Sequence, residues 1–172
     1  YVPKIKSNGV WSVADSLAFQ FDENFSSLKL QTNPIAKTVS GQELHTSSIV
    51  YSWVNELIKG KESFVRSKTI GKTKLKRPFM VLDIYKGSPK NKPVLVLLTR
   101  QHPPEVTGYL AFQAFLSTIL EENKLTASFL EHYRILAFPL MNPDGVDLGH
   151  WRHNAGGVDT NRDWSFYHQP EI

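Results

Sequence analysis

The sequence feature that most limits the possible folds is an apolar run at residues 94–98, followed by a polar turn and a long amphipathic pattern. A continuous Val/Leu run is typical of a parallel strand that is covered on both faces. From Tyr109 to Leu120, apolar residues recur at intervals of three and four, which indicates a helix with one broad apolar face. Pro103 and Pro104 suit the entry to that helix, because a proline in the first turn loses no intrahelical hydrogen bond. The stretch therefore predicts a strand, a turn and a helix in succession.

The turn carries two side chains that suit a metal ion, His102 and Glu105. Residues three apart at the start of a helix project to the same side, so this imidazole and this carboxylate could share one ion. Taken alone, the motif is more often a solvent-exposed helix start than a metal site. The position of the motif after a strand favours a metal site over an exposed helix start, because ligands of open α/β sheets lie beyond the carboxyl ends of the strands. The chain contains no cysteine, so a zinc site here would use His and carboxylate ligands.

The same reasoning from residue patterns covers the chain from residue 47 onward. Ser47 and Ser48 offer a helix N-cap, and Gly60 offers a helix stop. The predicted elements are helices at 49–59 and 126–132 and strands at 63–70, 78–86, 93–98 and 134–140. Asn142–Gly145 is a dense turn signal. Because strands alternate with helices, the predicted fold class is α/β, with a mixed, largely parallel sheet flanked by helices.

The first 46 residues differ from the rest in pattern. Short apolar pieces such as Val10–Val13 and Leu28–Leu30 are separated by polar and turn residues, which favours short strands over helices. We therefore expect a small β-rich segment at 1–46 and a larger domain at 47–172. The hydrophobic content of 41% and the charged content of 21% indicate globular structure rather than disorder. No stretch is long and apolar enough to predict a membrane span.

Residues 150–164 have neither helical nor strand periodicity, yet they are rich in Arg, Asn, His and Trp. A long irregular segment inside a compact domain is usually either functional or disordered. Trp151 and Trp164 argue against disorder, so we expect a functional loop.

Four motifs together carry a resemblance to a known family. They are Arg100–Tyr109, Asn142–Gly145, Trp151-Arg152 and Gly157–Trp164. In this order and spacing, the chain resembles the zinc-dependent metallocarboxypeptidases of the funnelin type, the carboxypeptidase A group, over roughly residues 47–172. The form of the motifs is most similar to bacterial members that carry a short β lobe before the catalytic domain. The resemblance implies a carboxypeptidase-like fold, of which this chain holds the N-terminal part of the catalytic domain.

The resemblance implies that His102 and Glu105 are ligands of a Zn²⁺ ion, which would activate a water molecule for attack on a peptide carbonyl. It also implies that Asp159 lies behind the metal site and orients His102 through its other ring nitrogen. Each residue has a simpler interpretation as well. His102 suits an ordinary capping or buried role, and Asp159 suits a turn. His150 and His153 are expected to have loop roles, because the family pattern assigns them no zinc contact.

The same resemblance assigns substrate roles to three residues of the loop. Arg152 would polarise the scissile carbonyl and stabilise the oxyanion. Asn161 and Arg162 would hold the terminal carboxylate of a peptide, because the planar guanidinium can bind a carboxylate with two hydrogen bonds. The simpler interpretation of both arginines is an ordinary surface position.

Two departures from the family pattern affect the expected activity. Pro104 stands where some members carry an arginine that contacts substrate. The third zinc ligand, a His, and the general-base Glu are expected beyond residue 172. We therefore expect the chain alone to be inactive, with part of the active site and an unpaired sheet edge. The missing C-terminal half of the domain, or a second copy of the chain in a homo-oligomer, would cover that edge.

The function predicted from the sequence is zinc-dependent hydrolysis of C-terminal residues from peptides with a free carboxylate. The alternatives are a non-catalytic domain that binds peptide C-termini and a zinc amidase or deacylase of related fold. Residues 59–92 hold eleven of the twenty Lys and Arg, but no nucleic-acid motif appears, so we expect a solvated face and no nucleic-acid partner. The first residue, Tyr1, and the bacterial form of the motifs favour a periplasmic or secreted protein.

Overall fold

The computed structural model describes residues 4–13, 19–21, 28–32, 36–40 and 45–172. The chain divides into two compact units, residues 1–44 and residues 45–172, and each is described by itself. The domain limits drawn from the sequence, 1–46 and 47–172, stay a prediction. None of the helices in the described part of the chain has the length and hydrophobicity that crossing a bilayer requires.

The first unit contains short strands. Its strands are β1 (Lys4–Ser7), β2 (Val10–Val13), β3 (Phe19–Phe21), β4 (Leu28–Leu30) and β5 (Ala36–Ser40). They form a three-stranded antiparallel sheet in the order β2-β1-β5 and a separate β3-β4 pair. Asn8 and Gly9 join β1 to β2 with φ of 50° and 81°, and such a pair of positive φ angles gives a tight hairpin whose twist matches that of its strands.

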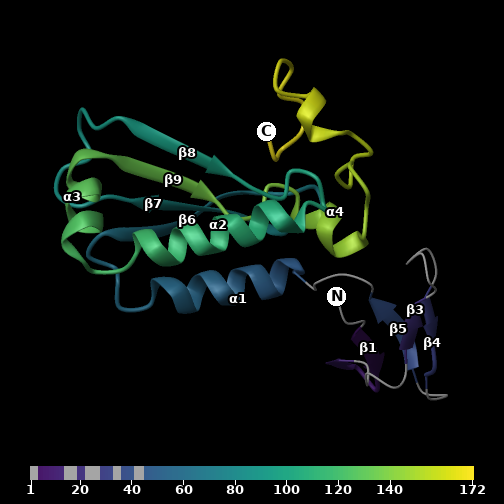
Figure 1. The fold of residues 1–172 in the computed structure, drawn as a ribbon. Coiled ribbons are helices and arrows are strands. Elements are labelled where there is room, and N and C mark those ends of the chain that lie inside the picture. The colour runs from purple at the N-terminus through teal and green to yellow at the C-terminus, as the bar shows by residue number, and fades with distance from the viewer. Residues whose placement is uncertain (1–3, 14–18, 22–27, 33–35, 41–44) are drawn as a thin grey trace. The chain divides into compact units, whose positions relative to one another are not determined.

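The second unit alternates strands and helices (Figure 1). Its elements are α1 (Ser47–Ile58), β6 (Val65–Lys72), β7 (Pro78–Ile84), β8 (Val94–Leu98), α2 (Val106–Ile119), α3 (Lys124–His132), β9 (Arg134–Phe138), α4 (Pro143–Leu148) and the 3₁₀ turn η1 (Thr160–Arg162). Every helix and strand predicted beyond residue 47 is present with shifted ends. The N-cap of α1 is Thr46, whose side chain accepts the N–H of Ile49, and not Ser47 or Ser48.

The sheet of this unit has the strand order β6-β7-β9-β8. The mixed α/β fold predicted from the sequence is confirmed, but the pairing corrects the expectation that the sheet is largely parallel. β8 and β9 are parallel, whereas β6-β7 and β7-β9 are antiparallel. The reason is the length of the connections. A short turn links β6 to β7, and only antiparallel neighbours can be joined that way, whereas β8 reaches β9 through α2 and α3.

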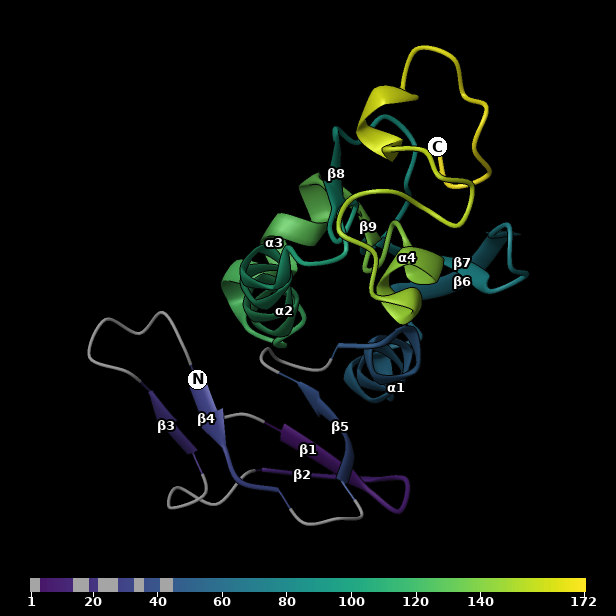
Figure 2. The same ribbon diagram turned by 90° about the vertical axis from the view of Figure 1, so that its right-hand side faces the viewer.

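The hydrophobic core lies between one face of the sheet and the helices α1 and α2. Figures 1 and 2 show both helices on the same side of the sheet, with the C-terminal residues on the other side. The buried core side chains from the helices are Val50, Val54, Tyr109, Phe112 and Leu116, and those from the sheet include Leu82, Ile84, Ile135 and Ala137. Burial of these side chains, at about 25 cal/mol for each Å² of apolar surface, fixes α2 on the sheet and with it the turn that precedes α2.

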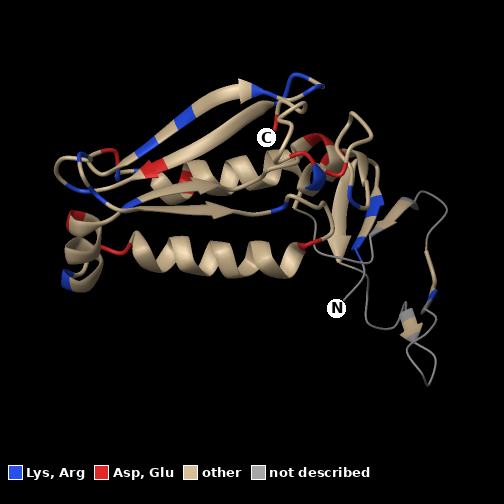
Figure 3. Ribbon diagram, turned by 90° about the horizontal axis from the view of Figure 1, so that it is seen from above, with Lys and Arg blue, Asp and Glu red and all other residues tan. Residues whose placement is uncertain are grey.

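The run at 94–98 forms the predicted strand β8, but the expectation that it is covered on both faces is wrong. Val94 is 48% exposed and Val96 is 52% exposed, because β8 is an edge strand whose one partner among the described strands is β9. The opposite edge differs in chemistry. β6 carries Arg66, Lys68 and Lys72, and Figure 3 colours the Lys and Arg positions of the ribbon blue. Charges of this kind protect an edge from pairing with other chains, and β8 has none.

The Asn142–Gly145 motif begins a helix, which corrects the turn predicted there. Pro143 occupies the first turn of α4, and the side chain of Asn142 accepts the N–H of Gly145 as an N-cap. An Asn followed by Pro suits a helix start as well as a turn. The helix ends at Gly149, whose φ of 72° is a left-handed conformation that glycine adopts without strain.

Candidate active site

The turn between β8 and α2 holds His102 in a fixed orientation. The His102 residue is 6% exposed, and both of its ring nitrogens face carboxylates. Nδ1 lies 2.7 Å from Oε1 of Glu105, and Nε2 lies 2.9 Å from Oδ1 of Asp159. Glu105 is the N-cap residue of α2 and its side chain is 55% exposed. The structure therefore brings together the two predicted metal ligands and the residue predicted to orient one of them.

Asp159 connects the turn to the loop that follows α4. Its Oδ1 also accepts the backbone N–H of Asn161 at 3.0 Å, and its Oδ2 accepts Nε of Arg152 at 3.1 Å. Burial alone would raise the pKa of this carboxyl group. The hydrogen bonds from His102, Arg152 and Asn161 outweigh that effect and lower the pKa of Asp159 to about 2. Asp159 is therefore a carboxylate over the whole physiological pH range.

The ionised Asp159 determines which nitrogen of His102 carries a proton. A carboxylate accepts hydrogen bonds and does not donate them, so Nε2 of His102 is the protonated nitrogen in the neutral ring. Nδ1 then directs a lone pair toward the carboxylate of Glu105, 2.7 Å away. Two such electron-pair donors repel each other unless a proton or a cation lies between them, and imidazole nitrogen with carboxylate oxygen is a donor set that zinc favours. These two residues therefore fit a zinc ion as two of its ligands.

No group of three or more His, Cys, Asp or Glu side chains within the described residues is arranged to hold a metal ion. Within the part of the chain that the structure describes, the donor set is thus His102 with Glu105. A catalytic zinc site uses three protein ligands and keeps one position for water or substrate. His150 and His153 stack on each other with ring centroids 4.2 Å apart, and within the described residues neither forms a metal-binding group with the pair.

Arg152 lies beside His102. Its side chain is 44% exposed, and its terminal NH2 is 3.2 Å from Nε2 of His102. The ion pair with Asp159 holds the guanidinium in place while leaving part of it accessible. A cation held beside the metal ligands is suited to stabilise negative charge that develops on a bound carbonyl oxygen.

Asn161 and Arg162 lie in η1, which Asp159 caps. Both residues are exposed. Nη1 of Arg162 donates to the carbonyl of Asn161 at 3.1 Å, and within the described residues the guanidinium has no ion pair. An exposed guanidinium without an acidic partner on the protein is available to a carboxylate from outside.

The sequence analysis missed the buried polar residues beneath the site. Asp144 is fully buried and accepts hydrogen bonds from Thr73 Oγ1, Leu75 N and Arg77 Nη1 at 2.8–2.9 Å. Asp147 accepts Nε of Arg77 at 2.7 Å, and both the backbone N–H and the hydroxyl of Ser47. These bonds tie α4 to α1 and to the turn between β6 and β7. The signal in the sequence was Asp144 inside the Asn142–Gly145 motif, which had been interpreted as a turn residue.

Asn142 joins this framework to the two loops of the site. Its Nδ2 donates to the carbonyl oxygens of Gln101 and His153, which are the neighbours in sequence of His102 and Arg152. Gly145 is required beside it, because a Cβ there would lie 2.7 Å from the His153 carbonyl oxygen and as close to the Asn142 amide. Asn142 therefore fixes the distance between the turn that carries His102 and the loop that carries Arg152.

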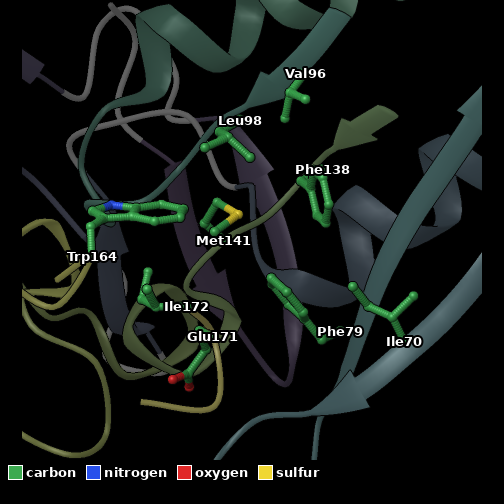
Figure 4. Close-up of a pocket in the computed structure, with 9 residues that line it drawn as sticks. All are labelled: Ile70, Phe79, Val96, Leu98, Phe138, Met141, Trp164, Glu171 and Ile172. Carbon is green, nitrogen blue, oxygen red and sulfur yellow. The ribbon is translucent and has the colours of Figure 1, made fainter. Parts of the chain in front are cut away.

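A pocket of about 350 Å³ lies on the other face of the sheet (Figure 4). Its lining residues are Ile70, Phe79, Val96, Leu98, Phe138, Met141, Trp164, Glu171 and Ile172. The carboxylate of Glu171 points away from the apolar side chains in Figure 4. Neither His102 nor Glu105 lines this pocket, so it is separate from the metal ligands.

Comparison with known proteins identifies the relatives of this chain. The family model described as zinc carboxypeptidase matches residues 50–171. Cytosolic carboxypeptidase 1 of Gallus gallus is 33% identical over 75 residues, which are 44% of this chain and 6% of that protein. Cytosolic carboxypeptidase 6 of Mus musculus is 27% identical over 118 residues, covering 65% of this chain and 22% of that protein. The chain therefore spans only a part of these curated relatives.

Solved structures show the same fold. A putative carboxypeptidase A from Shewanella denitrificans superposes with a TM-score of 0.73 at 20% identity, over 100% of this chain and 46% of that chain. A metallo-carboxypeptidase from Burkholderia cenocepacia does so with a TM-score of 0.73 at 18% identity, over 100% of this chain and 47% of that chain. This chain thus covers about half of each of these two structures.

The fold of this chain is that of the carboxypeptidases among these solved structures. More particularly, the chain belongs to the zinc carboxypeptidase family. The family and the fold predicted from the sequence motifs are thereby confirmed, as is the prediction that the chain holds part of the domain. The zinc ion, the peptide substrates and the roles of the single residues are proposals.

Proposed function

We propose that this protein is a zinc-dependent metallocarboxypeptidase that removes C-terminal residues from peptides. The observation that supports the proposal best is the position of His102, with Nδ1 at the carboxylate of Glu105 and Nε2 at the carboxylate of Asp159. A histidine whose second nitrogen is bonded to a carboxylate is the usual arrangement of a metal ligand. The family match over residues 50–171 supports the same chemistry.

In this proposal His102 and Glu105 hold the zinc ion, and Asp159 orients His102 for that task. Bound zinc would supply a water molecule whose pKa is lowered enough for attack on a peptide carbonyl at neutral pH. A third ligand and a general-base Glu are needed as well, and we propose that they lie in sequence beyond residue 172. By itself, the present chain would then be inactive.

Arg152 and the η1 turn would bind the substrate. The exposed part of the Arg152 guanidinium would donate to the carbonyl oxygen of the scissile bond, and this hydrogen bond would strengthen as the oxygen becomes negative. Arg162 would bind the terminal carboxylate with two parallel hydrogen bonds, with the Asn161 amide as a further donor. A free carboxylate would thus be the feature of the substrate that these residues recognise.

Hydrolysis of paired substrates tests the proposal. The full-length protein is given blocked dipeptides that differ only in a free or an amidated C-terminus, with and without a zinc chelator. We expect rapid cleavage of the free acid alone, lost with the chelator and restored by zinc. Equal rates on both substrates would favour the alternative of an amidase or deacylase. Binding of the free acid without hydrolysis would favour a non-catalytic domain that binds peptide C-termini.

A zinc titration of the present chain by calorimetry tests the ligand set. Because two protein donors are fewer than a zinc site uses, we expect weak binding that His102→Ala removes. Tight binding with a stoichiometry of one that His102→Ala abolishes would contradict the proposal. It would mean that a third ligand comes from within residues 1–172.

We also propose that β8 is covered in the functional protein. Its Val and Leu side chains are exposed at an edge without charges, which is the kind of edge that proteins normally pair or cover. The further part of the catalytic domain is the proposed cover, and a second copy of the chain is the alternative. Light scattering of the chain with and without Val96→Lys tests the second copy, since a dimer through β8 would dissociate in the variant.

The compartment stays a prediction. The sequence motifs favoured export to the periplasm or out of the cell, whereas the relatives from Gallus gallus and Mus musculus are named cytosolic carboxypeptidases. Fractionation of the native cells, followed by detection with an antibody against residues 45–172, decides between the two.

A further inference from the structure

Gln101, the residue before His102, contacts three residues of the loop at 150–164, namely Thr160, Asn161 and Trp164. The backbone carbonyl of Gln101 accepts Oγ1 of Thr160 at 3.5 Å and Nδ2 of Asn142 at 3.4 Å. Its side-chain amide faces two N–H donors, the indole of Trp164 and the backbone of Asn161. An amide NH₂ group cannot accept from either, so the amide oxygen must be the atom that faces them.

In this orientation Oε1 of Gln101 accepts Nε1 of Trp164 at 2.8 Å and the N–H of Asn161 at 3.2 Å. The same N–H of Asn161 lies 3.0 Å from Oδ1 of Asp159, so two acceptors share it. Gln101 is half-buried, and its neighbour His102 is buried. One side chain therefore holds both ends of the segment 161–164 against the turn that carries the metal ligands.

We propose that Gln101 is a positioning residue, which fixes Asn161 and Arg162 at a set distance from the metal ligands through its bonds to Asn161 and Trp164. This inference rests on the proposed function and deepens it, because the distance between the metal and the carboxylate-binding pair determines which peptide bond is cleaved. Asn161 and Arg162 have few other restraints. Both are exposed, and the bonds of η1 to the rest of the protein run through Asp159, Thr160 and Gln101.

The first test is independent of hydrolysis and uses the indole N–H resonance of Trp164 in the zinc-loaded full-length protein. Trp164→Phe identifies the signal among those of the other tryptophans, since its signal disappears. Gln101→Met keeps the length of the side chain but removes the oxygen acceptor, and we expect an upfield shift of the Trp164 signal. Gln101→Glu keeps oxygen acceptors and is expected to return the signal toward its original position.

The second test measures hydrolysis of a blocked dipeptide with a free carboxylate by the full-length protein. We expect Gln101→Met to raise KM about tenfold, the equivalent of two hydrogen bonds of modest net strength, with kcat and zinc content within about twofold of the original. Trp164→Phe removes one of the two donors and should raise KM less. A purely structural role of Gln101 would instead lower zinc content, kcat and Tm together.

The outcomes separate this inference from the proposed function. If Gln101→Met changes neither the indole signal nor KM while the unmodified protein hydrolyses the substrate, the inference is wrong and the proposed function stands. If the unmodified protein hydrolyses nothing, the proposed function fails. The indole signal then still shows whether Gln101 holds the segment.

Discussion

The polar residues of Asn142–Asp147 and the loop residues Arg152, Asn161 and Arg162 form two segments in opposite environments. In the first, Asn142 and Asp144 are fully buried, and every side-chain acceptor of Asp144 and Asp147 has a donor. In the second, Arg152, Asn161 and Arg162 are exposed and keep hydrogen-bonding capacity for a ligand. The first segment is a buried framework, and the second carries the proposed contacts to substrate. Burial, rather than residue type, separates polar groups that hold the structure from those that could bind substrate.

The largest effect that this comparison predicts is on stability, from Asp144→Ala. The substitution removes the buried carboxylate that accepts hydrogen bonds from Thr73, Leu75 and Arg77. Breaking a buried ion pair, here that of Asp144 with Arg77, typically costs about 3–5 kcal/mol of stability. Asp147→Ala is the matched control, because this side chain is 18% exposed and its loss should cost clearly less. Urea denaturation of both variants measures the difference. Equal losses would remove the distinction between the fully buried and the half-buried acid of this framework.

Arg152→Ala is expected to lower activity strongly while changing stability little. Removal of a donor to the developing oxyanion typically lowers kcat by about 100- to 1000-fold, whereas loss of an exposed side chain changes stability by no more than about 0.5 kcal/mol. Turnover by the full-length protein and thermal unfolding give the two values. A large drop in Tm would show that Arg152 belongs to the framework.

Asp159→Asn tests the connection between the loop at 150–164 and the turn that carries His102. The amide can no longer accept from His102 and Arg152 with the strength of a carboxylate, and loss of such support typically weakens metal binding about 10- to 100-fold. The measurement is competition for zinc with a chelator in the full-length protein. Asp163→Asn is the control, since this buried carboxylate bonds to Gln169 and not to His102. The same loss in both variants would make the effect one of loop stability.

The smallest predicted effect concerns the pH dependence of stability through Glu171. Burial raises the pKa of this carboxyl group, although a hydrogen bond from Asn154 acts in the opposite direction. A raised pKa means that stability is greatest below the unfolded-state pKa of about 4.3 and falls as the pH rises through the folded-state pKa. Glu171→Gln should flatten this fall, which Tm measured between pH 4 and pH 7 reports. Parallel pH profiles of both proteins would show that Glu171 is not the cause.

Hydrophobic periodicity was sufficient to predict the longer elements of the second unit, but not the short helix α4 or the turn η1. The apolar residues of α2 recur at the spacing of one helical face, so the turn before it, with His102 and Glu105, was located correctly. The exposure of β8 was not predictable in this way. An apolar run indicates a strand, but the number of its faces that are covered depends on where the strand lies in the sheet.

The candidate site could be predicted only in part. The spacing of His102 and Glu105 is local, and simple helix geometry brings them together. The contact of His102 with Asp159 spans 57 positions and depends on the packing of a loop without periodicity. Its role came from the family resemblance. Gln101 and Asp144 both lie in family motifs, but their roles were missed, because residue type alone does not distinguish a buried polar side chain from an exposed one.

The position of β8 also has a consequence for the time course of synthesis. β9 is the one described strand that pairs with β8, and 35 residues separate the end of β8 from the start of β9. At a translation rate of roughly 5–20 residues per second, the ribosome needs about 2–7 s to make them. During these seconds an uncharged Val/Leu segment has no strand partner on either side. Such a segment is a natural target for chaperones, and expression without them is expected to favour aggregation that begins at β8.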